Sequence, residues 1–360
     1  MLNQYCISVI VPFFNAKLHI EKCIKSLKNQ DFNKSFEIIM VDDASYDTGK
    51  EKVKNLMDNN IRLFSLKNNS GPGAARALGL KKAKGEYIFF LDVDDTIEKS
   101  ALSTLYKIAK KNNFDLVFCD RKWVENFKNI RKEKYAYSKN KFFNKIELKK
   151  SMNKRFYDPL YAVGLFQLTG RLIKRSIIVK NKITFEKKLR YLEDESFEWD
   201  ILGYIRNAIY IRKQLYSYYL HNNISTGLSE GISKNFPISN FKLVKKHIEK
   251  SLKNKKFTRK NIKKIGNQGF IFLIASSLIS LSRSILLGKI SLRSGNKAKT
   301  KLISNILSNS DVKAAINDYT ISNKESSGII KAIKFKLPNL LNSASTIRAK
   351  EIINLRREKK

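Results

Sequence analysis

Three carboxylates stand within four residues of one another, directly after an apolar segment. Asp92, Asp94 and Asp95 follow the run at residues 87–91. In a site with little water these side chains would repel one another, and a divalent cation removes that repulsion. Mg²⁺ and Mn²⁺ take oxygen ligands and are often completed by substrate phosphates. The spacing therefore favours a site for a metal ion and a diphosphate. A solvated turn that caps the next helix is the alternative.

Two further segments have the chemistry to contact a nucleotide. Asp42 and Asp43 follow a predicted strand over 36–41, and paired acids at this place can accept hydrogen bonds from a ribose hydroxyl or a base N–H. A helix N-cap at Asp43 or Ser45 is the alternative. The segment SGPGAAR at 70–76 only partly matches the dinucleotide-binding fingerprint. Arg76 stands where the third small residue belongs, so the pattern argues against a dinucleotide site, although a phosphate could lie near this helix start.

The elements that must position these residues alternate along the chain. The apolar and amphipathic periods predict strands over 7–11, 36–41, 61–66 and 87–91, and helices over 18–29, 49–57 and 74–83. This alternation predicts a mostly parallel sheet with helices on both faces. Both acidic pairs fall where strands end, which is where such sheets bind ligands.

The second half of the chain is less regular in sequence. Residues 122–154 mix charged and aromatic side chains, and we expect an irregular or helical insertion there. A helix is expected over 196–202 and an aromatic-rich strand over 209–219.

Composition sets outer limits on the kind of protein. The 360 residues suggest two domains, and 42% hydrophobic residues exclude a wholly disordered chain. Three widely spaced cysteines form neither a disulfide framework nor a CxxC metal site, which favours a reducing compartment. The first apolar run lacks the basic flank of a signal peptide and is too short to span a bilayer, so we do not expect secretion by that route.

Five segments, taken together in this order, resemble a known family. They are ISVIVPFFN at 7–15, VDDAS at 41–45, SGPGAARALGL at 70–80, GEYIFFLDVDD at 85–95 and YLEDESF at 191–197. As a set they are similar to inverting family 2 glycosyltransferases of the GT-A type, over roughly residues 5–225. The resemblance implies a Rossmann-like GT-A catalytic domain over 1–225 and a basic, mainly helical region over 226–360.

The resemblance also implies roles for particular residues. Contacts to the nucleotide sugar are expected from residues spread over all five segments: Pro12, Asn15, Asp43, Arg76, Asp92 and Glu193. Asp94 is the expected principal metal ligand, for Mn²⁺ or Mg²⁺. His221 is a further candidate ligand, because some relatives place a metal-binding histidine at about this distance after the base.

Asp194 matches the general base of the family. The chemistry agrees, because an acceptor hydroxyl must lose its proton as it attacks the anomeric carbon. The leaving diphosphate must also be neutralised, which calls for a divalent ion. An acidic first helical turn that favours the helix dipole is the alternative interpretation of Glu193, Asp194 and Glu195. Gly170-Arg171 resembles the acceptor-side segment of the family, where lysine is more usual at the second position, and this departure leaves the acceptor contacts open.

The positive charge is concentrated toward the C-terminus. The net charge is +39 overall, and successive thirds of the chain carry +3, +14 and +22. Drift in composition is one explanation, and a polyanionic partner is the other. Residues 270–287 form an apolar run that contains Arg283, for which a buried or interfacial helix fits better than a span. Lysine-rich helices beside it favour an anionic membrane surface.

The resemblance implies an enzyme that transfers a hexosyl or N-acetylhexosaminyl group. The donor is expected to be a nucleotide-diphosphate sugar, with UDP favoured by the resemblance, and the acceptor a glycan or lipid-linked hydroxyl in bacterial surface polysaccharide, lipooligosaccharide or capsule synthesis. The expected location is cytoplasmic, peripheral at the inner membrane face. The alternatives are a nucleotidyltransferase and a basic nucleic-acid-binding protein. The C-terminal third is poor in aromatics and resembles no nucleic-acid module, so nucleic acid is not an expected partner.

Overall fold

The computed structural model describes residues 5–125, 129–131, 136–157, 164–220, 238–320 and 327–357. The chain divides into two compact units, which are described separately below. The first unit contains Met1–Lys150 and Ala162–Asn222, and the second contains Ser151–Tyr161 and Asn223–Lys360.

Four parallel strands form one half of the sheet in the first unit. They are β1 (Tyr5–Phe13), β2 (Phe36–Asp42), β3 (Ile61–Ser65) and β4 (Gly85–Phe90), in the order β3-β2-β1-β4. Ile10 pairs with Ile39 on one side and with Phe90 on the other. Such runs of buried β-branched and aromatic residues are typical of parallel strands covered on both faces. All four predicted strands are confirmed.

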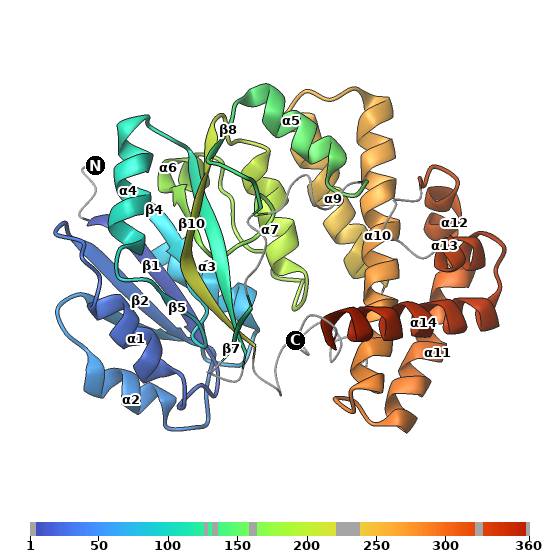
Figure 1. The fold of residues 1–360 in the computed structure, drawn as a ribbon, viewed down its shortest axis with the longest axis horizontal. Helices are drawn as coiled ribbons and strands as arrows, with labels where there is room; N and C mark the ends of the chain where they lie inside the picture. The colour runs from blue at the N-terminus through green and yellow to red at the C-terminus, as the bar shows by residue number, and fades with distance from the viewer. Residues whose placement is uncertain are drawn as a thin grey trace. The chain divides into compact units, whose positions relative to one another are not determined.

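Helices cover both faces of this half of the sheet (Figure 1). The apolar residues of α1 (Ile20–Lys28), α2 (Gly49–Leu56) and α4 (Ala101–Lys111) join one core cluster with the alternate strand residues Ile7, Val9 and Val11. Helix α3 (Pro72–Lys82) packs on the opposite face, where Gly79 lets it approach Ile10 closely: a Cβ at Gly79 would lie 2.4 Å from Ile10 Cγ2. The three predicted helices in this region are confirmed.

The other half of the sheet mixes strand directions. β6 (Leu116–Glu125) and β10 (Ala208–Leu220) run parallel, and β9 (Arg171–Lys174) lies antiparallel between β4 and β6. Shorter antiparallel strands flank them: β5 (Thr96–Ile97), β7 (Asn129–Arg131) and β8 (Lys141–Phe143). The sheet order is therefore β3-β2-β1-β4-β9-β6-β10-β5.

The prediction for residues 122–154 was wrong in part. Strand β6 continues to Glu125, β7 and β8 follow, and α5 (Lys145–Lys154) is the one helix among the residues of this stretch that the structure describes. Later in the unit, α6 (Arg175–Lys180) follows β9, and α7 (Glu193–Leu202) starts three residues before the helix that the sequence predicted.

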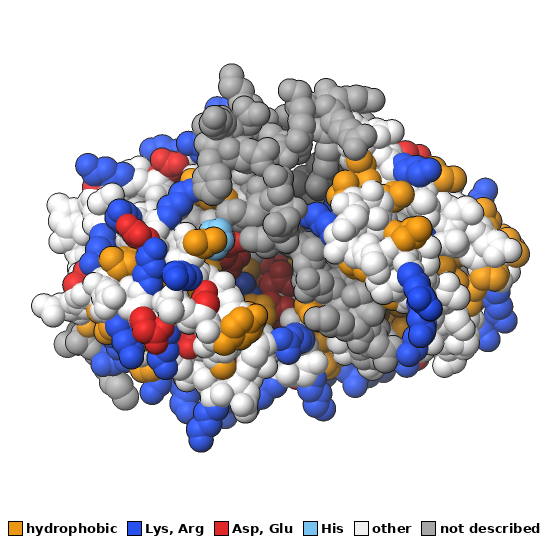
Figure 2. Space-filling view, turned by 90° about the horizontal axis from the view of Figure 1, so that it is seen from below, with side chains coloured by type: hydrophobic (Ala, Val, Ile, Leu, Met, Phe, Trp, Pro, Cys, Tyr) orange, Lys and Arg blue, Asp and Glu red, His pale blue; other side chains and the backbone are white. Residues whose placement is uncertain are grey.

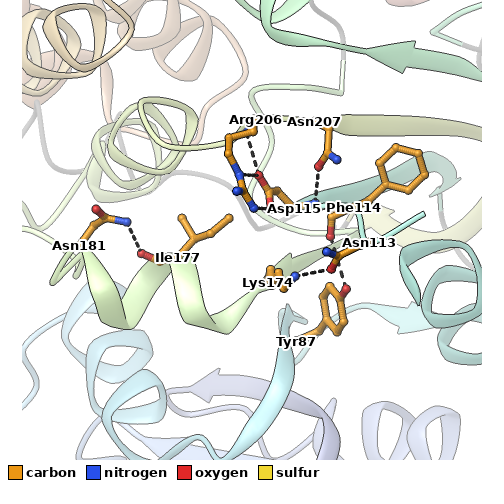
Figure 3. A network of polar contacts seen from close by, with 9 residues as sticks. All are labelled: Tyr87, Asn113, Phe114, Asp115, Lys174, Ile177, Asn181, Arg206 and Asn207. Carbon is orange, nitrogen blue, oxygen red and sulfur yellow. Dashed lines mark hydrogen bonds and ion pairs between the residues drawn. The ribbon is translucent and has the colours of Figure 1, made fainter. Parts of the chain in front are cut away.

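A polar network closes the amino ends of β6 and β10 (Figure 3). Asp115 is fully buried, and its carboxylate accepts hydrogen bonds from the Arg206 backbone N–H and guanidinium at 2.8–3.1 Å. The Asp115 backbone carbonyl accepts from Lys174 N–H at 3.0 Å. Every charged oxygen here has a protein donor, which is what a buried carboxylate needs to be stable.

The second unit is helical in the parts that the structure describes. The helices are α9 (Ile238–Asn254), α10 (Arg259–Leu286), α11 (Leu292–Ser308), α12 (Ser310–Ile316), α13 (Ser327–Lys334) and α14 (Pro338–Arg357). Helix α10 is central, because α9, α11, α12 and α14 all pack on it. It alone among the described helices is long and apolar enough to cross a membrane, yet 61% of its most apolar window is buried. Packing within this unit accounts for most of that apolar character.

Candidate active site

The loops after β1, β2 and β4 meet at one edge of the sheet. These strands are parallel, so residues 14–16, 43–45 and 91–95 leave the sheet at its carboxyl edge. The acidic segments that the sequence singled out are therefore neighbours in space, as expected for ligand-binding loops of an α/β sheet.

Arg76 joins two acidic segments that are far apart in the chain. Its Nη2 lies 2.9 Å from Asp92 Oδ1, and its Nη1 lies 2.9 Å from Glu193 Oε1. Arg76 is 7% exposed and Glu193 is 6% exposed, so this bridge is largely shielded from solvent. Gly73 makes the approach possible, because a Cβ there would lie 2.8 Å from Glu193 Cγ. Helices α3 and α7 are thus fastened together directly beside Asp92.

Negative charge exceeds positive charge around this bridge. Burial, together with the charge of Asp92, raises the pKa of Asp94 to about 6. Burial also pushes the pKa of Glu193 upward, with the neighbouring Asp194 adding to the effect and Arg76 opposing it. Figure 2 shows acidic side chains gathered in the middle of a face on which lysine and arginine are otherwise widespread. Shifts of this kind mark places where a ligand supplies the missing charge.

Asp95 has a structural role that the sequence did not assign to it. Its carboxylate accepts from the Tyr216 hydroxyl at 2.5 Å and from the Tyr219 backbone N–H at 2.9 Å. The Tyr216 hydroxyl in turn accepts from the Asp92 backbone N–H at 3.3 Å. Asp95 therefore ties the acidic loop to β10 and does not cap a helix, since Ser100 is the N-cap residue of α4. Sequence reasoning missed Tyr216, for which the aromatic run 216–219 was the available signal.

Asp194 lies in the first turn of α7 and faces solvent. Its Oδ1 accepts a hydrogen bond from the Glu195 backbone N–H at 2.8 Å. Leu192, the residue before the helix, has φ +64, and this left-handed turn directs the chain into α7. Three carboxylates in one first turn do suit the helix dipole. That alternative does not explain why Glu193 points inward to Arg76 while Asp194 points outward.

The loops after β1 and β2 hold each other in place. Asn15 Oδ1 accepts from the Tyr46 N–H at 3.0 Å, and the Asn15 N–H donates to Ser45 Oγ at 2.9 Å. Pro12 is buried in β1, opposite Val41. Asn15 and Ala44 both have positive φ angles, +49 and +59. Non-glycine residues in this region are strained, and such residues cluster at functional loops.

Asp43 anchors the glycine turn before α3. Its two carboxylate oxygens accept from the backbone N–H groups of Ser70 and Gly71, each at 2.8 Å. Burial raises the pKa of Asp43 above its usual value, and these two donors oppose that effect. The N-cap alternative is wrong for Asp43, because α2 begins at Gly49 with Thr48 as its N-cap residue.

Arg171 and His221, which the sequence had also singled out, have different outcomes. Arg171 is almost fully buried, and its guanidinium donates to the Leu165 and Gly164 carbonyls at 3.1 and 2.5 Å. It therefore supports a loop from within, which is why arginine at this position does not indicate an acceptor contact. His221 lies outside the described residues, so its expected metal role stays a prediction.

The carboxylates at this edge suit a divalent cation that shares its coordination with a substrate. No three His, Cys, Asp or Glu side chains are grouped to hold a metal within the described part of the chain. Mg²⁺ and Mn²⁺ are commonly held by one or two carboxylates plus phosphate oxygens. The raised pKa of Asp94 reflects negative charge that such an ion would offset. The donor set therefore fits the ion.

Comparisons with known proteins agree with this geometry. The model of the family described as Glycosyl transferase family 2 matches residues 8–177. Poly(ribitol-phosphate) beta-N-acetylglucosaminyltransferase TarP of Staphylococcus aureus is 32% identical over 239 residues, covering 62% of this chain and 67% of that protein. A GalNAc(5)-diNAcBac-PP-undecaprenol beta-1,3-glucosyltransferase of Campylobacter jejuni is 37% identical over 175 residues, covering 43% and 56%.

The fold also has a solved counterpart. S. aureus TarS 1–349, in complex with UDP-GlcNAc, superposes with a TM-score of 0.64 at 21% identity, covering 94% of this chain and 90% of that one. The first unit is thus a GT-A glycosyltransferase fold. The chain belongs to glycosyltransferase family 2, as its five segments had indicated.

Proposed function

We propose that the protein is an inverting, metal-dependent hexosyl- or N-acetylhexosaminyltransferase that uses a UDP-sugar. The observation that carries the proposal is the group of carboxylates around Arg76 at the carboxyl edge of the sheet. The acceptor is a hydroxyl of a glycan or a lipid-linked precursor in bacterial surface-glycan synthesis. Support for this acceptor class comes from the activities after which TarP and the C. jejuni enzyme are named.

The nucleotide lies over the ends of β1 and β2 in this proposal. Pro12 and Asn15 border the pocket, and the interlocked loops keep it preformed. Asp43 has accepted only two of the roughly four hydrogen bonds that an ionised carboxylate can take, which leaves capacity for a uracil N–H. Arg76 and Asp92 lie toward the ribose and diphosphate. Because Arg76 is already paired, it orients Asp92 rather than neutralising the diphosphate by itself.

Asp94 is the proposed principal metal ligand, and His221 a second. A Mn²⁺ or Mg²⁺ ion held there would neutralise charge on the leaving diphosphate. We assign Asp95 to holding the loop rather than to coordination, because it is buried and its carboxylate faces Tyr216 and the Tyr219 N–H. The loop is consequently rigid on its β10 side, which fixes where Asp94 is presented.

Asp194 is the proposed general base. Its solvent-facing carboxylate can reach an approaching acceptor hydroxyl and take its proton as the hydroxyl attacks the anomeric carbon. Glu193 cannot share this task, because it is buried against Arg76. Its ion pair instead fixes the start of α7, and so the position of Asp194. Glu193 thus supports the donor site through Arg76.

A screen of sugar nucleotides tests the proposal. UDP release is measured for UDP-, GDP- and dTDP-sugars with Mn²⁺, with Mg²⁺ and with a chelator. We expect slow hydrolysis of one UDP-sugar only when metal is present, with identified free sugar as the second product. A screen in which no nucleotide sugar binds or is hydrolysed under any condition would contradict the enzyme assignment.

We also propose peripheral attachment to the cytoplasmic membrane face through the second unit. The turn between α13 and α14 exposes Phe335 by 65% and Leu337 by 44%, with Lys334 and Lys336 beside them. Lys336 lies close enough to Lys313 to lower the pKa of Lys313. Exposed apolar residues beside lysines suit an anionic lipid surface.

Vesicle binding tests this attachment. The wild type is expected to sediment with phosphatidylglycerol vesicles and not with phosphatidylcholine vesicles, and less so as salt increases. Phe335→Ser with Leu337→Ser should weaken sedimentation about thirtyfold, because roughly 2 kcal/mol of apolar burial is lost. The matched control is Leu18→Ser in the first unit, where Leu18 is also highly exposed. Equal binding by the double variant and the control would rule out this turn.

A further inference from the structure

One face of the β6–β10 pair carries a row of aromatic side chains around an arginine. Arg121 pairs in register with Tyr216, and Trp123 pairs with Tyr218. The Trp123 and Tyr218 rings make an edge contact with centroids 4.8 Å apart. The Arg121 guanidinium lies 5.6 Å from the Tyr216 ring and 5.8 Å from the Tyr218 ring. Tyr216 is buried, whereas the other three are half-buried, so the row runs outward from the core.

Arg121 differs from Arg76 and Arg206 in its partners. Arg76 and Arg206 each pair with carboxylates, but Arg121 has no carboxylate partner among the residues the structure describes. Its single backbone contact, from Nη2 to the Thr169 carbonyl, is long at 3.5 Å. Its Nε and the Trp123 indole Nε1 are both buried without an acceptor in the described part of the chain. A buried N–H group without an acceptor is unfavourable for folding.

The row ends beside the acidic loop, on the side away from the proposed nucleotide site. Tyr216 connects the two directly, since its hydroxyl contacts the Asp95 carboxylate and the Asp92 N–H. In the sheet order, β2 and β1 lie on one side of β4, and β6 and β10 lie on the other. A ligand on this row would therefore face the acidic loop from the side opposite a nucleotide on β1 and β2.

We propose that Arg121, Trp123 and Tyr218 form a subsite for a phosphorylated sugar or polyol unit of the acceptor. The apolar C–H face of the unit packs against the Trp123 and Tyr218 rings, and its phosphate binds the Arg121 guanidinium. The subsite rests on the proposed function, because it becomes an acceptor site only if the donor occupies the other side.

Tryptophan fluorescence provides a direct test. The chain has two tryptophans, of which Trp199 is fully buried in α7 and Trp123 is half-buried in the row, and the Trp123→Phe variant separates their emission. The full-length protein is first saturated with UDP and Mg²⁺, which blocks phosphate binding at the donor site. It is then titrated with glucose 1-phosphate, with glucose and with inorganic phosphate. We expect glucose 1-phosphate to change the emission and to bind about tenfold more tightly than glucose or phosphate alone.

The outcomes separate the two proposals. Failure of UDP to bind in the first step would count against the proposed function itself. Binding of UDP with no response to glucose 1-phosphate, or an equal response to inorganic phosphate, would overturn the subsite alone.

Variants then test the residues. Arg121→Gln should weaken glucose 1-phosphate binding about tenfold, and Trp123→Phe should abolish the emission change while calorimetry still detects binding. Arg206→Gln is the matched control, because it removes an arginine at the other end of the same strands. Equal affinity in Arg121→Gln and Arg206→Gln would overturn the assignment of Arg121.

Discussion

The two ends of the sheet treat buried charge differently. At the amino end, Glu37 is fully buried and accepts from Ser8 Oγ, from Arg62 Nη1 and from the Lys84 N–H, at 2.6–2.7 Å. Asp115 likewise accepts hydrogen bonds from Arg206 (Figure 3). At the carboxyl end, by contrast, Arg76 alone bridges Asp92 and Glu193, with Asp94 and Asp194 close by in sequence.

This difference distinguishes carboxylates that stabilise the fold from carboxylates that bind a ligand. The amino-end carboxylates have several donors each, as expected where stability alone is at stake. The carboxyl-end group has more negative charge than its arginine can balance, and burial opposes ionisation there. Such an arrangement is costly for folding and is expected where a cationic ligand completes it. Substitutions at the two ends test that contrast, from the largest expected effect to the smallest.

Asp194→Asn should produce the largest loss. The amide keeps the shape of the side chain but cannot accept the acceptor proton, so turnover should fall by about 10²–10⁴-fold. UDP affinity should change by only a few fold, because Asp194 faces solvent and does not contact Arg76. Steady-state UDP release and UDP calorimetry measure the two effects. Turnover within a few fold of wild type would show that another group is the base.

Arg76→Gln should affect both stability and donor binding. It leaves Asp92 and buried Glu193 without their shared cation, which we expect to lower the free energy of unfolding by about 3 kcal/mol. Thermal unfolding with and without Mn²⁺ measures the loss. If Mn²⁺ raises the midpoint of the variant more than that of wild type, the cation is substituting for charge that the arginine supplied. A variant as stable as wild type would mean that the bridge is not needed to hold the acidic segments together.

Asp115→Asn should affect stability without affecting the chemistry. The Arg206 side chain is 66% exposed, so its freed charge is solvated. We therefore expect the free energy of unfolding to fall by about 2 kcal/mol. Chemical denaturation measures that loss, and UDP release per folded molecule should stay close to wild type. A hundredfold loss of turnover would break the distinction between the two ends.

Arg62→Gln should have the smallest effect. Glu37 keeps its hydrogen bonds from Ser8 and Lys84, so the expected loss is about 1 kcal/mol. Denaturant midpoints are measured side by side for this variant and for Arg76→Gln. The carboxylate that Arg62 pairs with has further hydrogen-bond donors, whereas Arg76 is the shared cation of two carboxylates. Equal losses in the two would contradict that comparison.

Much of this site was predictable from local sequence. The strands before Asp42 and Asp92 end in apolar runs, residues 38–41 and 87–91, so their carboxyl ends, and the acidic pairs that follow, could be placed by pattern alone. The antiparallel strand β9 could not be predicted in this way, because a pattern of four residues is too short to indicate the direction of a strand. The pairing of Arg76 with Glu193 spans 117 positions and depends on Gly73 in the packing of α3 against α7. Tyr216 likewise showed aromatic character but not its contact with Asp95.

UDP titration with and without Mn²⁺, on wild type, Asp94→Ala and Asp115→Asn, tests the central claim most directly. If the carboxyl-end charge exists to hold a metal–diphosphate group, wild type and Asp115→Asn should bind UDP with Mn²⁺. Chelation or Asp94→Ala should weaken that binding by about a hundredfold or more, since the ion supplies several kcal/mol. UDP affinity that is the same with chelator and in Asp94→Ala would contradict the claim.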